Sequence, residues 1–446
     1  VHYHQLEPHP RGRPEYRASV NLNDPWKGGW WRLSDILRGQ MEAAMATLEV
    51  AANNREMILK NMHAKAERSI DRGRTEAPYA FLFPPGQSDS NTALRFLEAL
   101  MEMGVEVHYA STPTRVGEAT YPEGTYVVFA GQTARPFLVS LLGRTIYRDS
   151  LWVRSQEGTP MMNYDFATQT LTEFKGVDVV EAETLPEGSF TELKAIKMPE
   201  GVVEDSNIGY VLDGRINDSF KAINLLSKTG VEAHRIHEAV TLGEEILPPG
   251  AFYIPKKKGV ESKLGKVAYE THLRFHGLEE EPWFNHVPVK PLKVAMYQRY
   301  WGGNMDEGWT RWLLEQYGFE YTTVMDKEVQ EGLEDYDVFI LPSDPPALIT
   351  GEDVEEWYDK RSKGAHTAPV LPPEYKTGIG EEGVEKVKEF VEKGGRVLAL
   401  YESCEFAIEK LGVPVRNTVK DLKGDEFHCP GSTIRVNIDN THPLGY

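Results

Sequence analysis

The first residues of the chain include four side chains that can bind a metal ion: His2, His4, Glu7 and His9. Successive side chains of a strand point to opposite faces, so His2 and His4 would share one face if this segment is extended. Imidazole and carboxylate groups are ordinary zinc ligands, and a zinc site needs at least three of them in suitable places. The cluster is a candidate metal site, but a solvated or ordinarily packed terminus is the favoured interpretation.

Cys404 is a candidate catalytic residue, because a thiolate beside a general base can act as a nucleophile. The segment Arg396–Tyr401 predicts a buried strand that leads directly into a helix, a turn on which an exposed nucleophile can sit. Tyr401 stands at that turn, however, and Cys404 follows three residues later without the glycines of a tight elbow. The neighbouring histidines that could serve as the base are His366 and His428, and a non-catalytic domain is the favoured interpretation.

The elements that would position these residues are repeated along the chain. The pattern glycine, apolar, glutamate, apolar occurs at Gly104–Val107, Gly230–Ala233 and Gly318–Tyr321. Each copy follows an apolar run typical of a strand, a polar loop, and a segment with apolar residues at helical spacing. Each glycine suits the left-handed position that ends a helix. The unit is strand, loop, helix, strand, and it predicts an α/β protein with several doubly wound domains in tandem.

Two of the copies extend further in the same way. Tyr121–Val128 and Leu247–Ile254 each place a Pro/Gly turn before another strand, at matching distances from the repeated glycine. We therefore expect two related domains followed by a third, more distant one. The predicted boundaries are 1–73, 74–200 with a β-rich insertion, 201–290, and 291–446.

The polar loops after the first strands, Gly86–Asn91 and Gly214–Ser219, have two interpretations. At the carboxyl ends of strands they could contact a ligand. Asp89 or Ser90 and Asp218 or Ser219 could instead cap the helices that follow, which is the favoured interpretation. No phosphate-binding glycine pattern accompanies these loops, so nucleotide binding has no support.

Composition excludes some classes of partner. The formal net charge of the 446 residues is -19, which argues against nucleic acid, because a phosphate-binding surface needs clustered Lys and Arg. No segment of the sequence approaches a membrane span. The two cysteines, Cys404 and Cys429, could pair but are too few to indicate a disulfide-built fold.

Tryptophan and glycine are concentrated in residues 24–33, before a long helix with one apolar stripe. The tryptophans could pack that helix onto a sheet that is missing from this chain, or they could form an aromatic platform for a ligand. Packing is the favoured interpretation.

This segment, Pro25–Ile36, together with Asn54–Glu56, resembles the end of the catalytic domain of large microbial zinc carboxypeptidase-like proteins. Glu381–Gly395 and Ser403–Leu411 resemble the amidotransferase-like, flavodoxin-like domain that ends the long extension of those proteins. Residues 1–73 would then be the remnant of an α/β zinc-peptidase domain. Residues 291–446 would be an amidotransferase-like domain that is truncated and non-catalytic.

The resemblance implies zinc held by two histidines and a glutamate, with a further glutamate as general base on the metal-bound water. All four are expected upstream of Val1. The family's first two ligands are spaced His-x-x-Glu, which occurs here at His4–Glu7 and His276–Glu279. About one match is expected by chance in an acidic chain with 13 histidines, so neither match identifies a ligand pair.

Three functions stay open at this point. The resemblance implies part of a secreted or periplasmic zinc metallocarboxypeptidase that acts on a peptide or protein substrate. The alternative is a non-enzymatic binding or assembly protein built from repeated α/β domains. The third is an amidotransferase-like hydrolase that uses Cys404. With any of these functions the chain could form a homo-oligomer.

Overall fold

A computed structural model describes residues 2–4, 28–146, 150, 153–155, 158–161, 170–300, 303–362, 372, 376, 378–429 and 434–446. The chain divides into two compact units. One comprises residues 1–62, 292–312 and 320–417, and the other comprises residues 63–291, 313–319 and 418–446. Helices alternate with mixed and parallel sheets, which confirms the predicted α/β class. Among the residues described, no helix is long and apolar enough to cross a membrane.

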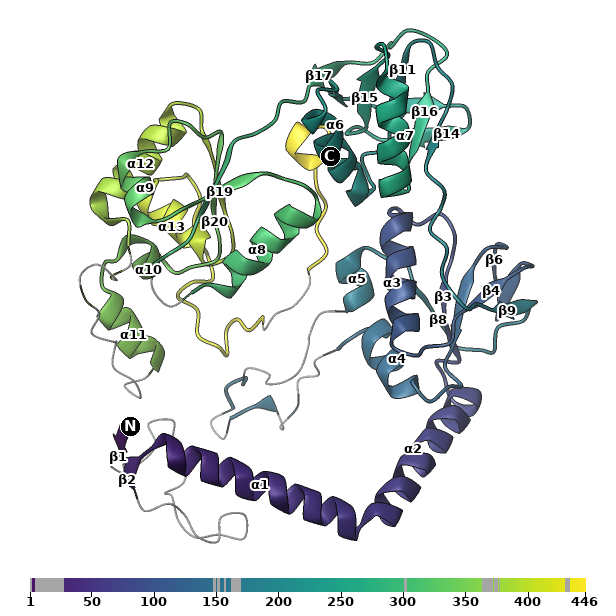
Figure 1. Cartoon of the computed structure of the whole chain (residues 1–446), viewed down its shortest axis with the longest axis vertical. Coiled ribbons are helices and arrows are strands. Elements are labelled where there is room, and N and C mark those ends of the chain that lie inside the picture. Colours follow the sequence, from purple (N-terminus) through teal and green to yellow (C-terminus); the bar gives the residue numbers. More distant parts are fainter. Residues whose placement is uncertain are drawn as a thin grey trace. The chain divides into compact units, whose positions relative to one another are not determined.

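The first repeated domain, drawn in blue in Figure 1, contains a five-stranded sheet with the order β8-β3-β7-β4-β9. Its elements are β3 (Ala80–Phe83), α3 (Ser90–Glu102), β4 (His108–Ala110), β5 (Thr114–Val116), β6 (Ala119–Tyr121), β7 (Tyr126–Phe129), α4 (Arg135–Leu142), α5 (Leu171–Lys175), β8 (Val180–Ala182) and β9 (Phe190–Glu192). Strand β7 is antiparallel to both β3 and β4. The two strands joined by α3 are therefore parallel, with β7 inserted between them, as in ferredoxin-like domains.

The second repeated domain has the same topology, within the sheet β10-β16-β11-β15-β12-β17. Its elements are β10 (Val202–Val203), β11 (Gly209–Leu212), α6 (Asn217–Lys228), β12 (His234–Ile236), β13 (Val240–Leu242), β14 (Glu245–Leu247), β15 (Phe252–Pro255), α7 (Val260–Thr271), β16 (Arg274–Gly277) and β17 (His286–Pro288). The order β16-β11-β15-β12 repeats β8-β3-β7-β4, and β17 flanks β12 as β9 flanks β4. The domain boundaries expected from the sequence stay a prediction.

The prediction of doubly wound, parallel sheets is wrong for these two domains. The strand that follows each Pro/Gly turn, β7 or β15, is reached through a short hairpin, β5–β6 or β13–β14. A hairpin returns the chain antiparallel, whereas a parallel neighbour requires a longer crossover. Residues 151, 152, 156, 157 and 162–169 of the predicted β-rich insertion, 151–180, lie outside the described residues, and residues 171–175 form α5.

Both faces of each repeated sheet are covered. In the second domain α6 and α7 pack on one face, where Leu212, Leu226 and Phe275 are buried. The hairpin β13–β14 covers the opposite face through Val240 and Leu247. The first domain uses α3 and α4 on one face and apolar residues of the β5–β6 hairpin on the other.

The repeated glycines end their helices as predicted. Gly104, Gly230 and Gly318 have φ angles of 83°, 75° and 70°. This left-handed conformation costs a glycine little but strains residues that carry a Cβ atom. The repeated pattern therefore encodes a helix stop at a fixed distance before the next strand.

The third sheet is parallel throughout, with the order β19-β18-β20-β21. The elements of this region are β18 (Val294–Tyr297), α8 (Met305–Gln316), β19 (Tyr321–Val324), α9 (Asp326–Glu331), β20 (Val338–Leu341), α10 (Pro346–Thr350), α11 (Val354–Ser362), α12 (Gly380–Glu392), β21 (Arg396–Ala399) and α13 (Ser403–Lys410). This order matches the start of the flavodoxin-like arrangement. The doubly wound prediction is confirmed for this sheet, and the likeness to amidotransferases stays a prediction.

The N-terminal region contains β1 (His2–His4), β2 (Gly29–Trp31), α1 (Leu33–Asn53) and α2 (Arg55–Thr75). β1 and β2 form a two-stranded antiparallel sheet. No residue of α1 is buried, and Met41 at the centre of its apolar stripe is 64% exposed. The packing of this helix onto a sheet missing from the chain therefore stays a prediction.

A buried polar contact joins the two repeated domains. Asp89 caps α3 by accepting the Thr92 N–H at 2.9 Å, and its other carboxylate oxygen accepts the Asn217 N–H of α6 at 3.0 Å. Asn91 donates to Asp218 at 2.8 Å, and Arg95 lies 2.8 Å from the same carboxylate. The predicted cap at Asp89 is confirmed, whereas Asp218 binds the preceding domain instead of capping its own helix.

We expect Asn91→Ala to lower the free energy of unfolding by about 1–3 kcal/mol, because Asp218 would lose a buried hydrogen-bond donor. The side-chain amide of Asn91 also donates to the Thr271 carbonyl at 3.0 Å, and that carbonyl would lose its donor as well. Urea unfolding followed by circular dichroism measures the difference. Asn207→Ala, at an exposed asparagine, is the matched control and should change stability by less than about 0.5 kcal/mol. Equal effects of the two substitutions would contradict this account of the contact.

Candidate functional site

The carboxyl-terminal edge of the parallel sheet gathers polar side chains from three loops. Arg299 follows β18, Asp344 follows β20, and Ser403 begins α13 just after β21. The chain leaves β18 toward β19 on one side, while β20 lies on its other side. Ligands of open α/β sheets bind at this kind of switch point, so this edge is the candidate site of the domain.

Asp344 is the central residue of the edge and is 4% exposed. Its carboxylate contacts the Arg299 guanidinium through one oxygen and accepts a hydrogen bond from the Asn304 amide at 2.8 Å through the other. Burial raises the pKa of Asp344 to about 6, and the contacts with Arg299 and Asn304 oppose that rise. A carboxyl group that titrates near this pH can exchange protons under physiological conditions.

Ser403 joins the start of α13 to the loop after β20 through hydrogen bonds. It is fully buried, and its hydroxyl donates to the Pro342 carbonyl at 2.5 Å while accepting the Asp344 N–H at 3.0 Å. The hydroxyl therefore fixes the start of α13 relative to the loop after β20. A second acid at the same edge, Asp326, accepts the Tyr297 hydroxyl at 2.6 Å, and burial raises its pKa.

The turn between β21 and α13 carries a tyrosine. Tyr401 has a φ of 47° and is 82% exposed. A bulky side chain in the left-handed region is uncommon and marks a turn whose geometry is imposed by its surroundings. The elbow position predicted from the sequence is thus a strained turn, but its exposed side chain is a phenol.

Cys404 lies one residue into α13, and its sulfur is 3.5 Å from the Ala399 carbonyl oxygen. The residue is exposed and not disulfide-bonded, as is Cys429. His366 lies outside the described residues. His428 is exposed and belongs to the other compact unit, so the pairing of Cys404 with either histidine stays a prediction.

The predicted metal cluster at the N-terminus is described only in part. His2 and His4 lie on β1, paired in register with Trp31 and Gly29, whereas Glu7 and His9 fall outside the described residues. Among the residues that are described, no group of three or more His, Cys, Asp or Glu side chains is arranged to hold a metal ion. No hydrolytic step is therefore assigned to the described residues.

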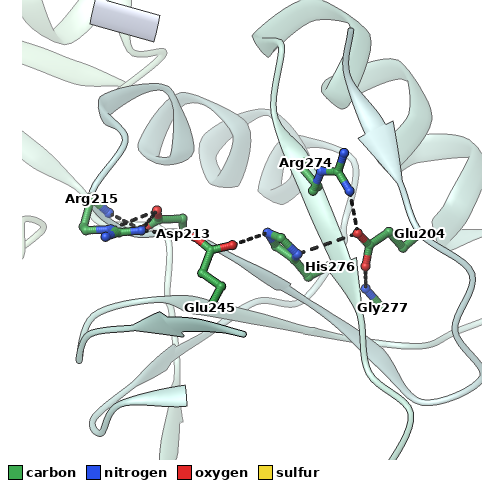
Figure 2. A network of polar contacts seen from close by, with 7 residues as sticks. All are labelled: Glu204, Asp213, Arg215, Glu245, Arg274, His276 and Gly277. Atoms are coloured by element: carbon green, nitrogen blue, oxygen red, sulfur yellow. Dashed lines mark hydrogen bonds and ion pairs between the residues drawn. The ribbon is translucent and has the colours of Figure 1, made fainter. Parts of the chain in front are cut away.

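His276, the other match to His-x-x-Glu, lies in a network of polar contacts in the second repeated domain (Figure 2). Its Nδ1 is 3.7 Å from Glu204, and its Nε2 is 4.0 Å from Glu245. Glu204 also accepts hydrogen bonds from the Arg274 guanidinium at 2.9 Å and from the Gly277 N–H at 3.0 Å. At the other end of the network, Asp213 accepts a hydrogen bond from Arg215. The pKa of Glu204 is lowered by these donors against the cost of its burial.

This network joins the segments that follow β10 and β11 to the hairpin β13–β14 and to β16, which is a structural role. Glu279, the second residue of the predicted spacing, instead helps line an open cavity of about 670 Å³ beside Glu204. Lys256 extends into this region, where it donates to the Ser206 carbonyl at 2.5 Å and pairs with Glu261. The positive charge of Lys256 is therefore already neutralised by Glu261 of the same domain.

Comparison of the chain with protein-family models, curated proteins and solved structures found no match. The sequence resemblance to zinc carboxypeptidase-like proteins accordingly stays a prediction. Asp344 and Arg299 were not among the residues that the sequence predicts to form a site. The usable signal for Asp344 was its place three residues beyond the apolar run Val338–Leu341, at the carboxyl end of an expected parallel strand.

Asp344 should make stability depend on pH in an unusual direction. Its folded pKa of about 6 lies above the ordinary value of about 3.9, so the folded protein retains a proton that the unfolded chain has lost. Ionisation of this group therefore reduces stability as pH rises from about 4 to about 6, and the reduction is complete above that range. Asp344→Asn removes this titration.

We expect the stability of Asp344→Asn relative to the parent protein to improve between pH 4.5 and pH 7, because only the parent protein loses stability as Asp344 ionises. Guanidinium unfolding midpoints at four pH values measure this difference. Asp306→Asn, at an exposed carboxylate of α8, is the control and should give a difference that does not vary with pH. A constant difference for Asp344→Asn would mean that its pKa is not raised.

Proposed function

We propose that this chain is the accessory region of a zinc metallocarboxypeptidase-like protein and that its own domains bind partners without hydrolysing them. The zinc ligands and the general base are expected in sequence that precedes Val1. The proposal rests on the resemblance of residues 25–36 and 54–56 to the end of such a catalytic domain. By the same resemblance, the protein would act outside the cytoplasm on a peptide or protein substrate.

The uncovered apolar face of α1 is the observation that carries this proposal. Its large apolar side chains are all exposed: Leu33, Ile36, Leu37, Met41, Met45 and Leu48. An amphipathic helix normally buries such a stripe, and contiguous apolar surface on a soluble protein marks an interaction site. A catalytic domain that ends in this helix would supply the cover, as the resemblance implies.

The turn between β21 and α13 argues against hydrolysis by Cys404 and in favour of a binding role. A nucleophile on this turn would need its reactive atom at position 401, where the chain has the phenol of Tyr401. The sulfur of Cys404 lies in the first turn of α13, beside the Ala399 carbonyl. The neighbouring Ser403 hydroxyl already donates a hydrogen bond to the Pro342 carbonyl in the loop after β20.

A non-enzymatic assembly protein remains a second candidate, and the exposed tryptophans of α8 favour it. Trp309 is 67% exposed and packs edge-to-face against Trp312 at 5.9 Å between ring centroids. Tryptophan side chains dominate the energetics of many protein interfaces. A tryptophan pair of this kind on a helix suits partner binding, with or without an attached peptidase.

The decisive experiment compares the product of the complete reading frame with the 446-residue chain. Release of C-terminal residues from a mixture of peptides is followed by mass spectrometry, with and without a zinc chelator. We expect chelator-sensitive release by the complete protein and none by the chain alone, because the chain's described residues do not form a catalytic zinc site. Absence of activity from the complete, zinc-loaded protein would leave the assembly function as the better explanation.

Cys404→Ala and Cys429→Ala form a matched pair for the third hypothesis, since both cysteines are exposed and unpaired. Neither variant should alter peptide release by the complete protein. Hydrolysis of glutamine or another amide by the chain alone, lost in Cys404→Ala but kept in Cys429→Ala, would overturn the non-catalytic interpretation of this domain.

A further inference from the structure

Two histidines of the second repeated domain face each other across neighbouring strands. His234 lies on β12, and His286 lies on the adjacent antiparallel strand β17. Their Nδ1 atoms are 3.1 Å apart, and the two rings are nearly perpendicular, with an interplanar angle of 85°. Both side chains are partly buried, so the two nitrogens meet at the margin of the domain.

The orientation of His234 is fixed from its other side. Its Nε2 lies 3.1 Å from a carboxylate oxygen of Glu232, and the second oxygen of Glu232 is paired with Lys257. A carboxylate accepts hydrogen bonds, so Nε2 carries the proton in the neutral ring. The lone pair of His234 is therefore on Nδ1, directed at His286. Metal-binding histidines commonly donate their second ring N–H to a carboxylate in this way.

The environment of His286 favours its neutral form. The rings of Tyr253 and Phe284 pack around it, with centroids 5.1 Å and 6.0 Å away. Burial lowers the pKa of His286, and the proximity of His234 lowers it further. Neutral imidazole is the form that binds metal ions.

We propose that His234 and His286 form a two-histidine site for a borderline divalent transition metal such as Zn²⁺ or Ni²⁺, with Glu232 orienting His234. Two imidazole nitrogens bound tetrahedrally at ordinary zinc distances are about 3.3 Å apart, close to the separation found here. Only two protein ligands are present, so water or an external ligand completes the coordination. This site is separate from the catalytic zinc of the proposed function.

The same geometry suits a direct hydrogen bond in which His286 donates its Nδ1 proton to His234. That bond needs no metal and disappears when both rings are doubly protonated. A metal would take the place of the shared proton, which would move to Nε2 of His286, because both rings bind the metal as neutral imidazoles. Metal titration therefore separates the two interpretations.

The first repeated domain provides an internal control. Ala110 pairs with Phe190 where the second domain pairs Ile236 with His286, so Phe190 occupies the place of His286. His108 occupies the place of His234, two residues before Ala110 on β4. The first domain thus presents one imidazole and a phenyl ring where the second presents two imidazoles.

The test is calorimetric titration of the chelator-treated 446-residue chain with ZnCl₂ and, separately, NiCl₂ at pH 7.5. We expect His286→Phe, which copies the first domain, to remove one equivalent of bound metal relative to the parent chain. His234→Gln should do the same. Glu232→Gln should weaken that equivalent about 10- to 100-fold, as loss of an orienting carboxylate does. His108→Ala is the matched control and should leave the titration unchanged.

Binding should weaken at pH 5.5, where imidazoles protonate. Circular dichroism confirms that each variant is folded before titration. Folded His286→Phe and His234→Gln proteins that bind as much metal, as tightly, as the parent chain would overturn the proposal and leave a simple hydrogen bond. Because the chain is titrated without any activity assay, this result is independent of whether the complete protein is a carboxypeptidase.

Discussion

Asp218 is 3% exposed and takes its partners from the preceding domain, and this buried contact decides how the two repeated domains are joined. A carboxylate removed from water is costly unless hydrogen bonds and opposite charge compensate it. Asn91 and Arg95 supply that compensation from α3, while Asp89 of the first domain satisfies the start of α6. The Asn217 N–H at the start of α6 is satisfied only through this contact, and the two domains fall within one compact unit.

The sequence patterns identified elements better than they identified the direction of strands. The glycines at 104, 230 and 318 were expected to end helices because a left-handed residue is needed there, and each does so. The strands β7 and β15 were recognised as strands, but their antiparallel insertion was not foreseen. Strand direction depends on whether a hairpin or a helix precedes the strand, and the short hairpins β5–β6 and β13–β14 have little periodicity of their own.

Local sequence likewise predicted some residues of the polar sites but not the pairs that the fold brings together. Tyr401 was placed at the strand-to-helix turn from local sequence, because an apolar strand followed at once by a helix fixes that position. Asp344 and Arg299 meet from loops 45 residues apart, and His234 and His286 meet from strands 52 residues apart. No spacing rule relates such pairs, since their proximity follows from strand order. Only the fold reveals which histidine faces which.

The two repeated domains bury equivalent residues, such as Leu100 with Leu226 and Val128 with Ile254, yet they differ at the edge strands β9 and β17. An edge strand contributes one partner to the sheet instead of two, so a change there disturbs fewer neighbours than a change at the centre. Duplication of a domain therefore gives a protein two copies of one core and two edges that are free to diverge. In evolutionary terms, the edge strand is where one copy can acquire a new chemical property while the other keeps the ancestral one.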